Sequence, residues 1–184
     1  IQKITGRLGN QMFQFARLYT LARDEGTDFY FQDPKYFEKY SNEIKQLFGE
    51  GIGYLDQVGV HVRRGLNPFI PTEPKYNENP FHLDNCSGDY YERAIAMFPG
   101  ENFVVYSDDP DYCRERFKGD NFQIMERGES DVNDFNLLAS SKHLIIANSS
   151  FSWWAAYLCP NEGKKIIAPK QWFADGIKRV GIPE

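Results

Sequence analysis

The sequence predicts an α/β protein built around a parallel sheet, and two observations carry this prediction. From residue 89 to residue 168, segments with helical periodicity alternate with short apolar segments of strand character, the pattern of repeated strand–helix units. The chain also has 184 residues, of which 41% are hydrophobic and 26% charged, as in ordinary globular proteins. We therefore expect a buried sheet with helices packed on its faces.

The first 57 residues are expected to form a short section ending at Gln57. Apolar residues recur every three or four positions over residues 12–22, which predicts a helix after the glycine-bracketed turn of residues 6–9. Backbone N–H groups at this helix start, with the amides of Asn10 and Gln11, suit an anion, and a plainly capped helix explains the pattern equally well. The other elements expected here are strands over residues 1–4 and 28–32 and a helix over residues 41–48.

The next segment alternates three valines with Gly59 and His61 over residues 58–62, which predicts a buried strand. It ends in Arg63 and Arg64, whose side chains point to opposite faces if strand geometry continues. A guanidinium group matches phosphate oxygens, and open α/β sheets bind ligands beyond the carboxyl ends of their strands. A phosphate-bearing ligand is one interpretation of the pair, and ordinary surface ion pairs are the other.

A loop containing four prolines follows over residues 66–87, beside this expected site. The remainder of the chain alternates regularly. Helices are expected over residues 89–98, 111–117, 131–140 and 151–158, and strands over residues 103–107, 122–125, 143–147 and 165–168.

Two of these strands end in polar residues at the same sheet edge as Arg63. Asp108 and Asp109 follow the first strand, where a carboxylate can accept from a nucleobase, bind a metal together with Asp111, or cap the next helix. A turn over residues 148–150 precedes the last helix, and its N–H and hydroxyl groups suit a phosphate. Because neither serine of the turn has a neighbouring base, nucleophilic catalysis is not expected there.

The composition excludes several classes of partner. The net charge is -5 without a basic block, which argues against nucleic acid as the main partner. Three cysteines at wide, unrelated spacings favour reduced thiols over a disulfide framework or a metal site. No apolar run approaches the roughly 20 residues that cross a bilayer. We expect a cytoplasmic protein without a membrane span, and peripheral membrane association stays compatible with the chain.

Four phrases in order, residues 6–16, 61–65, 107–109 and 148–154, resemble the GDP-fucose-dependent α-1,2-fucosyltransferases, a glycosyltransferase family 11-like group. The resemblance runs across nearly the whole chain. It implies a GT-B-type fold of two Rossmann-like lobes, here residues 1–57 and 58–184, with the first lobe short. It also implies inverting transfer of L-fucose from GDP-fucose to a galactose hydroxyl of a glycan acceptor, with no metal or other cofactor.

The same resemblance implies roles for individual residues. Arg63 would be the catalytic residue that holds the β-phosphate, His61 and Asp109 would help to read the guanosine, and the first lobe would close the cleft. The complete set implied to bind substrate is Asn10, Gln11, His61, Arg64, Asp108, Asp109, Ser149, Ser150, Phe151 and Ser152.

One departure from the family phrase concerns the residue after Gly65, where an aspartate is expected and Leu66 stands. Either the acid is lost or loop residues are missing from the sequence at this point. No catalytic base is therefore assigned, although loop carboxylates such as Asp33, Glu73 and Asp84 could reach an acceptor hydroxyl.

Two alternatives to the fucosyltransferase remain. Leu66 and the short first section favour a catalytically impaired GDP- or glycan-binding module. Asp108, Asp109 and Asp111 would instead serve a metal-dependent sugar-nucleotide transferase. An N-terminal anchor removed before Ile1 would make the chain a Golgi-lumen catalytic domain.

Overall fold

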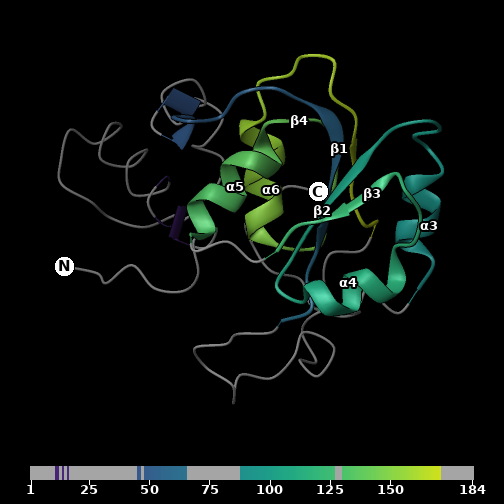
Figure 1. Ribbon diagram of the computed structural model, residues 1–184. Helices are drawn as coiled ribbons and strands as arrows, with labels where there is room; N and C mark the ends of the chain where they lie inside the picture. Colours follow the sequence, from purple (N-terminus) through teal and green to yellow (C-terminus); the bar gives the residue numbers. More distant parts are fainter. Residues whose placement is uncertain are drawn as a thin grey trace, which may run out of the picture.

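The structure of the protein is a computed structural model that describes residues 11, 12, 14, 16, 45, 46, 48–65, 88–126 and 130–170 (Figure 1). Within these residues, five strands form one parallel sheet in the order β3-β2-β1-β4-β5, which confirms the predicted sheet. The strands are β1 (Leu55–Val62), β2 (Phe103–Ser107), β3 (Phe122–Ile124), β4 (Ser141–Ile145) and β5 (Ile166–Ile167).

The central strand β1 pairs with β2 on one side and with β4 on the other, so both of its edges are occupied. Its last five residues are buried, which fits the β-branched valines and the absence of any long polar side chain there. Gly59 packs closely against Ser141 and Leu138. A Cβ added at Gly59 would lie 2.5 Å from Ser141 Oγ and 2.9 Å from Leu138 Cδ1. The glycine therefore permits a close approach of β1 to β4 and the helix before it.

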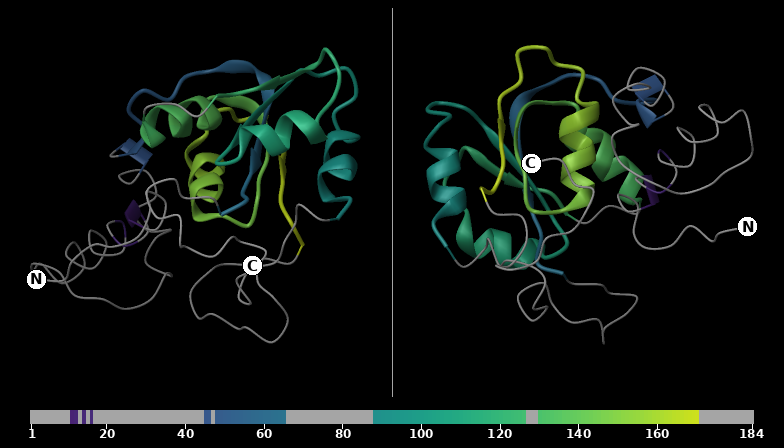
Figure 2. Two further views of the ribbon diagram at one scale, coloured as in Figure 1. Left: turned by 60° about the horizontal axis from the view of Figure 1, so that its bottom comes forward. Right: turned by 180° about the vertical axis from the view of Figure 1, so that it is seen from behind.

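Helices cover both faces of the sheet, as Figures 1 and 2 show from three directions. One face carries α3 (Tyr90–Ile95) and α4 (Pro110–Arg116), packed on Val58, Val60 and Val62. The other face carries α5 (Asp131–Ala139) and α6 (Ser150–Leu158), packed around Trp154. This arrangement of helices on a parallel sheet, with strand order 3-2-1-4-5, is that of a Rossmann-like fold.

The predicted elements of this region are all present, with shifted ends. The strand predicted over residues 143–147 is observed two residues earlier, as Ser141–Ile145. The polar residues Ser141 and Lys142 interrupt the apolar pattern from which the strand was predicted. In the fold Lys142 forms ion pairs with Asp56 and Glu101. β1 likewise begins at Leu55, three residues before the predicted start.

Predictions for the beginning of the chain are covered in part. Gln11, Met12, Gln14 and Ala16 are helical, in agreement with the helix predicted over residues 12–22, and so are Lys45, Gln46 and Phe48. The strands predicted over residues 1–4 and 28–32 and the loop predicted over residues 66–87 lie outside the described residues. None of the helices in the described ranges has the length and apolar character required to cross a membrane.

Candidate functional site

The candidate site lies where the strand order reverses. From β1 the chain moves outward to β2 and β3, and it later returns to place β4 against the opposite edge of β1. The two connections therefore leave β1 and β4 in opposite directions. In α/β folds this arrangement forms the ligand-binding crevice beyond the carboxyl ends of the two strands. The pairing of the two strands ends at Val60 and Ile145.

His61 lies at the end of β1, directly against the start of α6. Its ring stacks on Phe151 with centroids 5.3 Å apart, and the residue is 6% exposed. Burial lowers the pKa of His61 from 6.5 to about 4, against the opposing effect of the Asp108 carboxylate. Among the described residues Nδ1 is buried without a hydrogen-bond partner. The imidazole is thus neutral at pH 7, and one of its ring nitrogens can accept a hydrogen bond.

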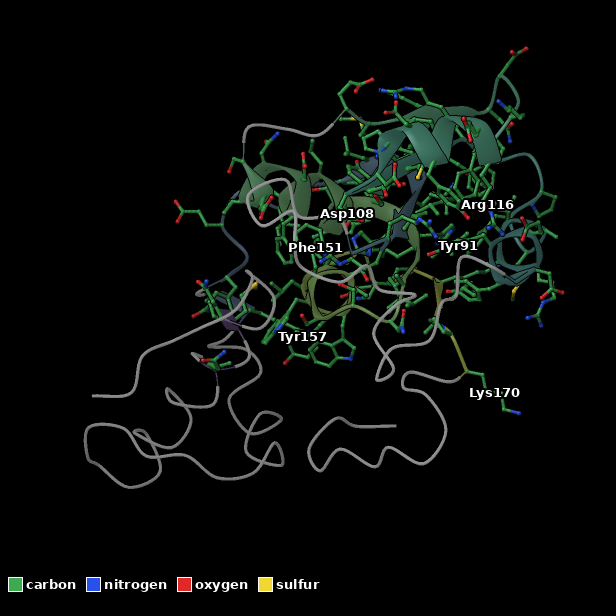
Figure 3. All side chains as sticks on the ribbon, turned by 90° about the horizontal axis from the view of Figure 1, so that it is seen from below. Tyr91, Asp108, Arg116, Phe151, Tyr157 and Lys170 are labelled. Carbon is green, nitrogen blue, oxygen red and sulfur yellow. The ribbon has the colours of Figure 1, made fainter. Side chains whose placement is uncertain are left out.

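Arg63 follows the strand and is oriented by Asp108 at the end of β2. Arg63 Nη1 lies 2.6 Å from Asp108 Oδ2, and the side chains are 14% and 7% exposed. The second carboxylate oxygen accepts from the backbone N–H of Arg64 at 2.8 Å. In Figure 3, which looks at the molecule from below, Asp108 and Phe151 lie in the middle of the view, with Tyr91 and Arg116 on the side of α3. Asp108 therefore fixes both the guanidinium and the backbone after β1.

Arg64 lies over the helix α4. Its guanidinium carbon is 4.2 Å from the centroid of the Tyr112 ring, and Nε is 3.8 Å from Asp109 Oδ2. The two arginines thus have different neighbours, as their predicted opposite orientation requires. The guanidinium thus lies over an aromatic face, to which a cation is attracted.

Asp109 is the N-cap of α4, where its Oδ1 accepts from the backbone N–H of Tyr112 at 3.2 Å. Asp111 is 92% exposed and pairs with Arg114. The carboxylates of Asp108 and Asp109 thus contact Arg63 and Arg64, whereas Asp111 pairs apart from them with Arg114. In the part of the chain that the structure describes, no group of three or more potential metal ligands comes together.

The turn before α6 follows the carboxyl end of β4, so the first N–H groups of that helix lie at this edge of the sheet. Ser149 is the N-cap and makes no capping hydrogen bond with its side chain. The Ser152 hydroxyl donates to the carbonyl oxygens of Ala147 and Ser149, at 3.2 and 3.3 Å. These hydrogen bonds hold the turn closed. A helix N-terminus carries partial positive charge and N–H donors, which suits an anion.

The remaining predicted site residues are placed in part. Gln11 is helical and exposed, whereas Asn10 lies outside the described residues. Ser150 begins α6, and Phe151 packs on His61 and Phe135. The assignment of all these residues to substrate binding stays a prediction.

Three tyrosines that contact the site were missed by the sequence reasoning. Tyr112 lies under Arg64, Tyr91 donates to the His61 carbonyl, and Tyr90 donates to the Ile146 carbonyl. The pattern offered one signal, an aromatic pair in the first turn of a helix that follows the long loop. Aromatic residues at such positions are usually predicted to be core residues. The hydrogen-bond partners of their hydroxyl groups depend on the tertiary structure.

The buried His61 makes stability fall in mild acid. Because its folded pKa of about 4 lies below the ordinary 6.5, the unfolded chain takes up a proton on His61 within this window while the folded chain does not. The contribution is complete above pH 6.5 and is lost as pH falls toward 4. The variant His61→Gln lacks this contribution. Between pH 7 and 4.5 we therefore expect the unfolding free energy of the variant to fall by about 2 kcal/mol less than that of wild type.

Urea unfolding of both proteins at several pH values measures this difference. The two proteins differ in no other ionisable group, so the comparison isolates His61. Parallel curves for wild type and variant would show that the imidazole is not desolvated as the structure indicates.

The order of the strands and the polar groups at their reversal define a Rossmann-like α/β protein. Residues 23–179 match the sequence profile described as glycosyl transferase family 11, and the chain belongs to that family.

Several curated relatives are similar to the chain. The O-antigen biosynthesis glycosyltransferase WbnK of Escherichia coli is 34% identical over 130 residues, 65% of this chain and 40% of that protein. An alpha-1,2-colitosyltransferase of Escherichia coli is 29% identical over 166 residues, 78% of this chain and 54% of that protein. The galactoside 2-alpha-L-fucosyltransferase SEC1 of Bos taurus is 29% identical over 129 residues, 66% of this chain and 33% of that protein.

The chain thus spans about a third to a half of the length of these relatives. No solved structure matches it significantly.

Proposed function

We propose that the protein transfers L-fucose from GDP-fucose to a galactose hydroxyl of a glycan, with inversion at the sugar carbon. The observation that supports this most lies at the strand reversal of a family 11 glycosyltransferase. There the neutral His61 stacks on Phe151 in the first turn of α6, and Arg63 follows two residues later, held by Asp108. A permanent cation and helix N–H groups suit a diphosphate, and a buried neutral ring suits an uncharged base.

The proposed architecture is GT-B-like, with a short lobe over residues 1–57 and a donor-binding lobe over residues 58–184. β1 begins at Leu55, so the proposed division falls within the first residues of this strand. In this proposal Asn10 and Gln11 close the cleft over the donor from the first lobe. Met12 and Ala16 pack in the same core cluster as Trp154, so the helix that carries Gln11 lies against the α6 face of the sheet.

In the proposed reaction the protein must stabilise GDP as the leaving group. The bond between the sugar carbon and the β-phosphate oxygen breaks, and its electron pair stays on GDP. The acceptor oxygen forms the new bond from the opposite face and releases its proton to a base or to water. Since negative charge grows on GDP as the bond breaks, a preplaced Arg63 and the N–H groups of α6 lower the barrier.

The donor site is proposed to work without a metal ion. Arg63 and the N-terminus of α6 supply positive charge where the phosphates would lie, and the nearby carboxylates are engaged in other contacts. Asp109 Oδ2 lies 3.8 Å from Arg64 Nε, and this oxygen is the group proposed to accept from guanine in place of that contact. His61 is the second residue proposed to help to read the guanosine.

Incubation of the protein with GDP-fucose and a β-galactoside tests the proposal. We expect GDP release and a fucosylated product with inverted anomeric configuration by NMR, both persisting in excess chelator. Calorimetry should show GDP binding. No GDP binding together with no product from a panel of galactosides would refute it, and GDP binding with no product, even in Leu66→Asp, would point to a binding module.

Colitose is a second candidate for the transferred sugar, because the alpha-1,2-colitosyltransferase matches over 166 residues of this chain. A competition assay with equal concentrations of GDP-fucose and GDP-linked colitose separates the two. A product carrying mainly colitose would replace fucose in the proposal and leave the GDP site unchanged.

A further inference from the structure

The carboxyl ends of β1 and β4 separate at the crevice, which leaves backbone carbonyls without strand partners. On β1, the N–H of Val58 bonds to Asn102 on the β2 side, so the backbone groups of His61 point to the β4 side. The β1–β4 pairing ends at Val60 and Ile145. The carbonyl of His61 therefore faces a gap where a continued ladder would have supplied an N–H.

A tyrosine hydroxyl fills that gap. Tyr91 Oη lies 3.0 Å from the His61 carbonyl oxygen, and its side chain is fully buried. The ring comes from α3, on the face of the sheet opposite to Phe151 of α6. Tyr91 thus holds the peptide bond between His61 and Val62 from the α3 face of the sheet.

The adjacent tyrosine does the same on the other side of β4. The N–H of Ile146 bonds to Ile167, and the ladder with β5 ends there, so the Ile146 carbonyl faces the β5 side unpaired. Tyr90 Oη lies 2.7 Å from this carbonyl and 3.0 Å from the Ile167 carbonyl. Burial also raises the pKa of Tyr90, so the hydroxyl keeps the proton that it donates.

The carbonyls that the two tyrosines hold, those of His61 and Ile146, lie shortly before Arg63 and before the turn into α6. Ile146 precedes Ala147, whose own carbonyl accepts from Ser149 N–H and Ser152 Oγ and so begins the turn into α6. Displacement of Ile146 would move the helix N-terminus, and displacement of His61 would move Arg63. A helix N-terminus is useful to a diphosphate only when its N–H groups point at the phosphate oxygens.

We infer that Tyr90 and Tyr91 are positioning residues that hold the β1 and β4 edges of the crevice at the separation a nucleoside diphosphate requires. The inference rests on the proposed function, since it takes GDP as the ligand. Neither hydroxyl needs to touch the ligand.

The test uses Tyr90→Phe and Tyr91→Phe, which keep the packed rings and remove one hydroxyl each. Tyr106→Phe is the matched control, because Tyr106 is also buried and its hydroxyl accepts from the Gln57 side chain. Calorimetry with GDP, steady-state kinetics and urea unfolding are measured on all four proteins.

We expect GDP affinity to fall about five- to tenfold in each α3 variant, as loss of one buried hydrogen bond allows. The KM for the donor should rise in parallel, while the KM for the acceptor stays within twofold of wild type. Tyr106→Phe should lose a similar amount of stability and keep wild-type GDP affinity. Amide exchange should increase over residues 147–150 in Tyr90→Phe.

Equal GDP affinity in wild type and both α3 variants would overturn the inference and leave the proposed function intact. A similar loss of GDP affinity in Tyr106→Phe would also overturn it, because the effect would then follow general stability. Wild-type protein that does not bind GDP would overturn the proposed function and the inference with it.

Discussion

Arg63→Ala should lower the transfer rate by about 10²- to 10³-fold, equivalent to about 3–4 kcal/mol in the barrier. In the proposed mechanism the guanidinium acts on charge that develops as GDP leaves, so its loss affects the transition state more than the ground state. We therefore expect kcat to fall much more than KM rises. Initial rates of GDP release at varied donor concentrations measure both.

Arg63→Lys is the matched variant for this prediction. Lysine keeps the positive charge and an ion pair with Asp108 but lacks the planar fork of the guanidinium. We expect intermediate activity, with stability near that of wild type. Near-normal kinetics in Arg63→Ala would remove Arg63 from the catalytic role.

Much of the fold could be predicted because its signals are local. The alternation of strands and helices after residue 88 rests on hydrophobic periodicity, and every element expected from residue 103 to residue 168 is observed. The predicted ends of the elements were less accurate where polar residues form ion pairs with residues distant in the sequence. Lys142, the second residue of β4, contacts Asp56 and Glu101, which lie 86 and 41 positions away, and no local pattern shows such pairing.

The candidate site could be predicted as a location and less well as a set of contacts. Arg63, Asp108 and Ser149 all follow strands, and parallel strands bring such residues to one edge of the sheet. The pairing of Arg63 with Asp108 depends on β1 and β2 being neighbours, which strand order alone decides. The hydroxyl contacts of Tyr90 and Tyr91 depend on where each ladder ends, and this could not be read from the sequence.

Asp108→Asn should lower kcat about tenfold or more, because a misplaced catalytic group loses much of its effect. The carboxylate holds Arg63 Nη1 and the backbone N–H of Arg64, and the amide keeps the shape but not the charge. Unfolding free energy should also fall by about 2–3 kcal/mol, since Arg63 would keep a largely buried charge without this counter-ion. Asp111→Asn is the control, because that carboxylate is 92% exposed, and it should retain activity within twofold.

The double variant Arg63→Ala with Asp108→Asn decides how Asp108 acts. If Asp108 works through Arg63, the double variant should be no slower than Arg63→Ala alone, since the group being positioned is already gone. If Asp108 instead contacts the donor, as the family resemblance implies, the two losses should multiply. The observed geometry favours the first outcome, because both carboxylate oxygens are engaged by Arg63 and Arg64.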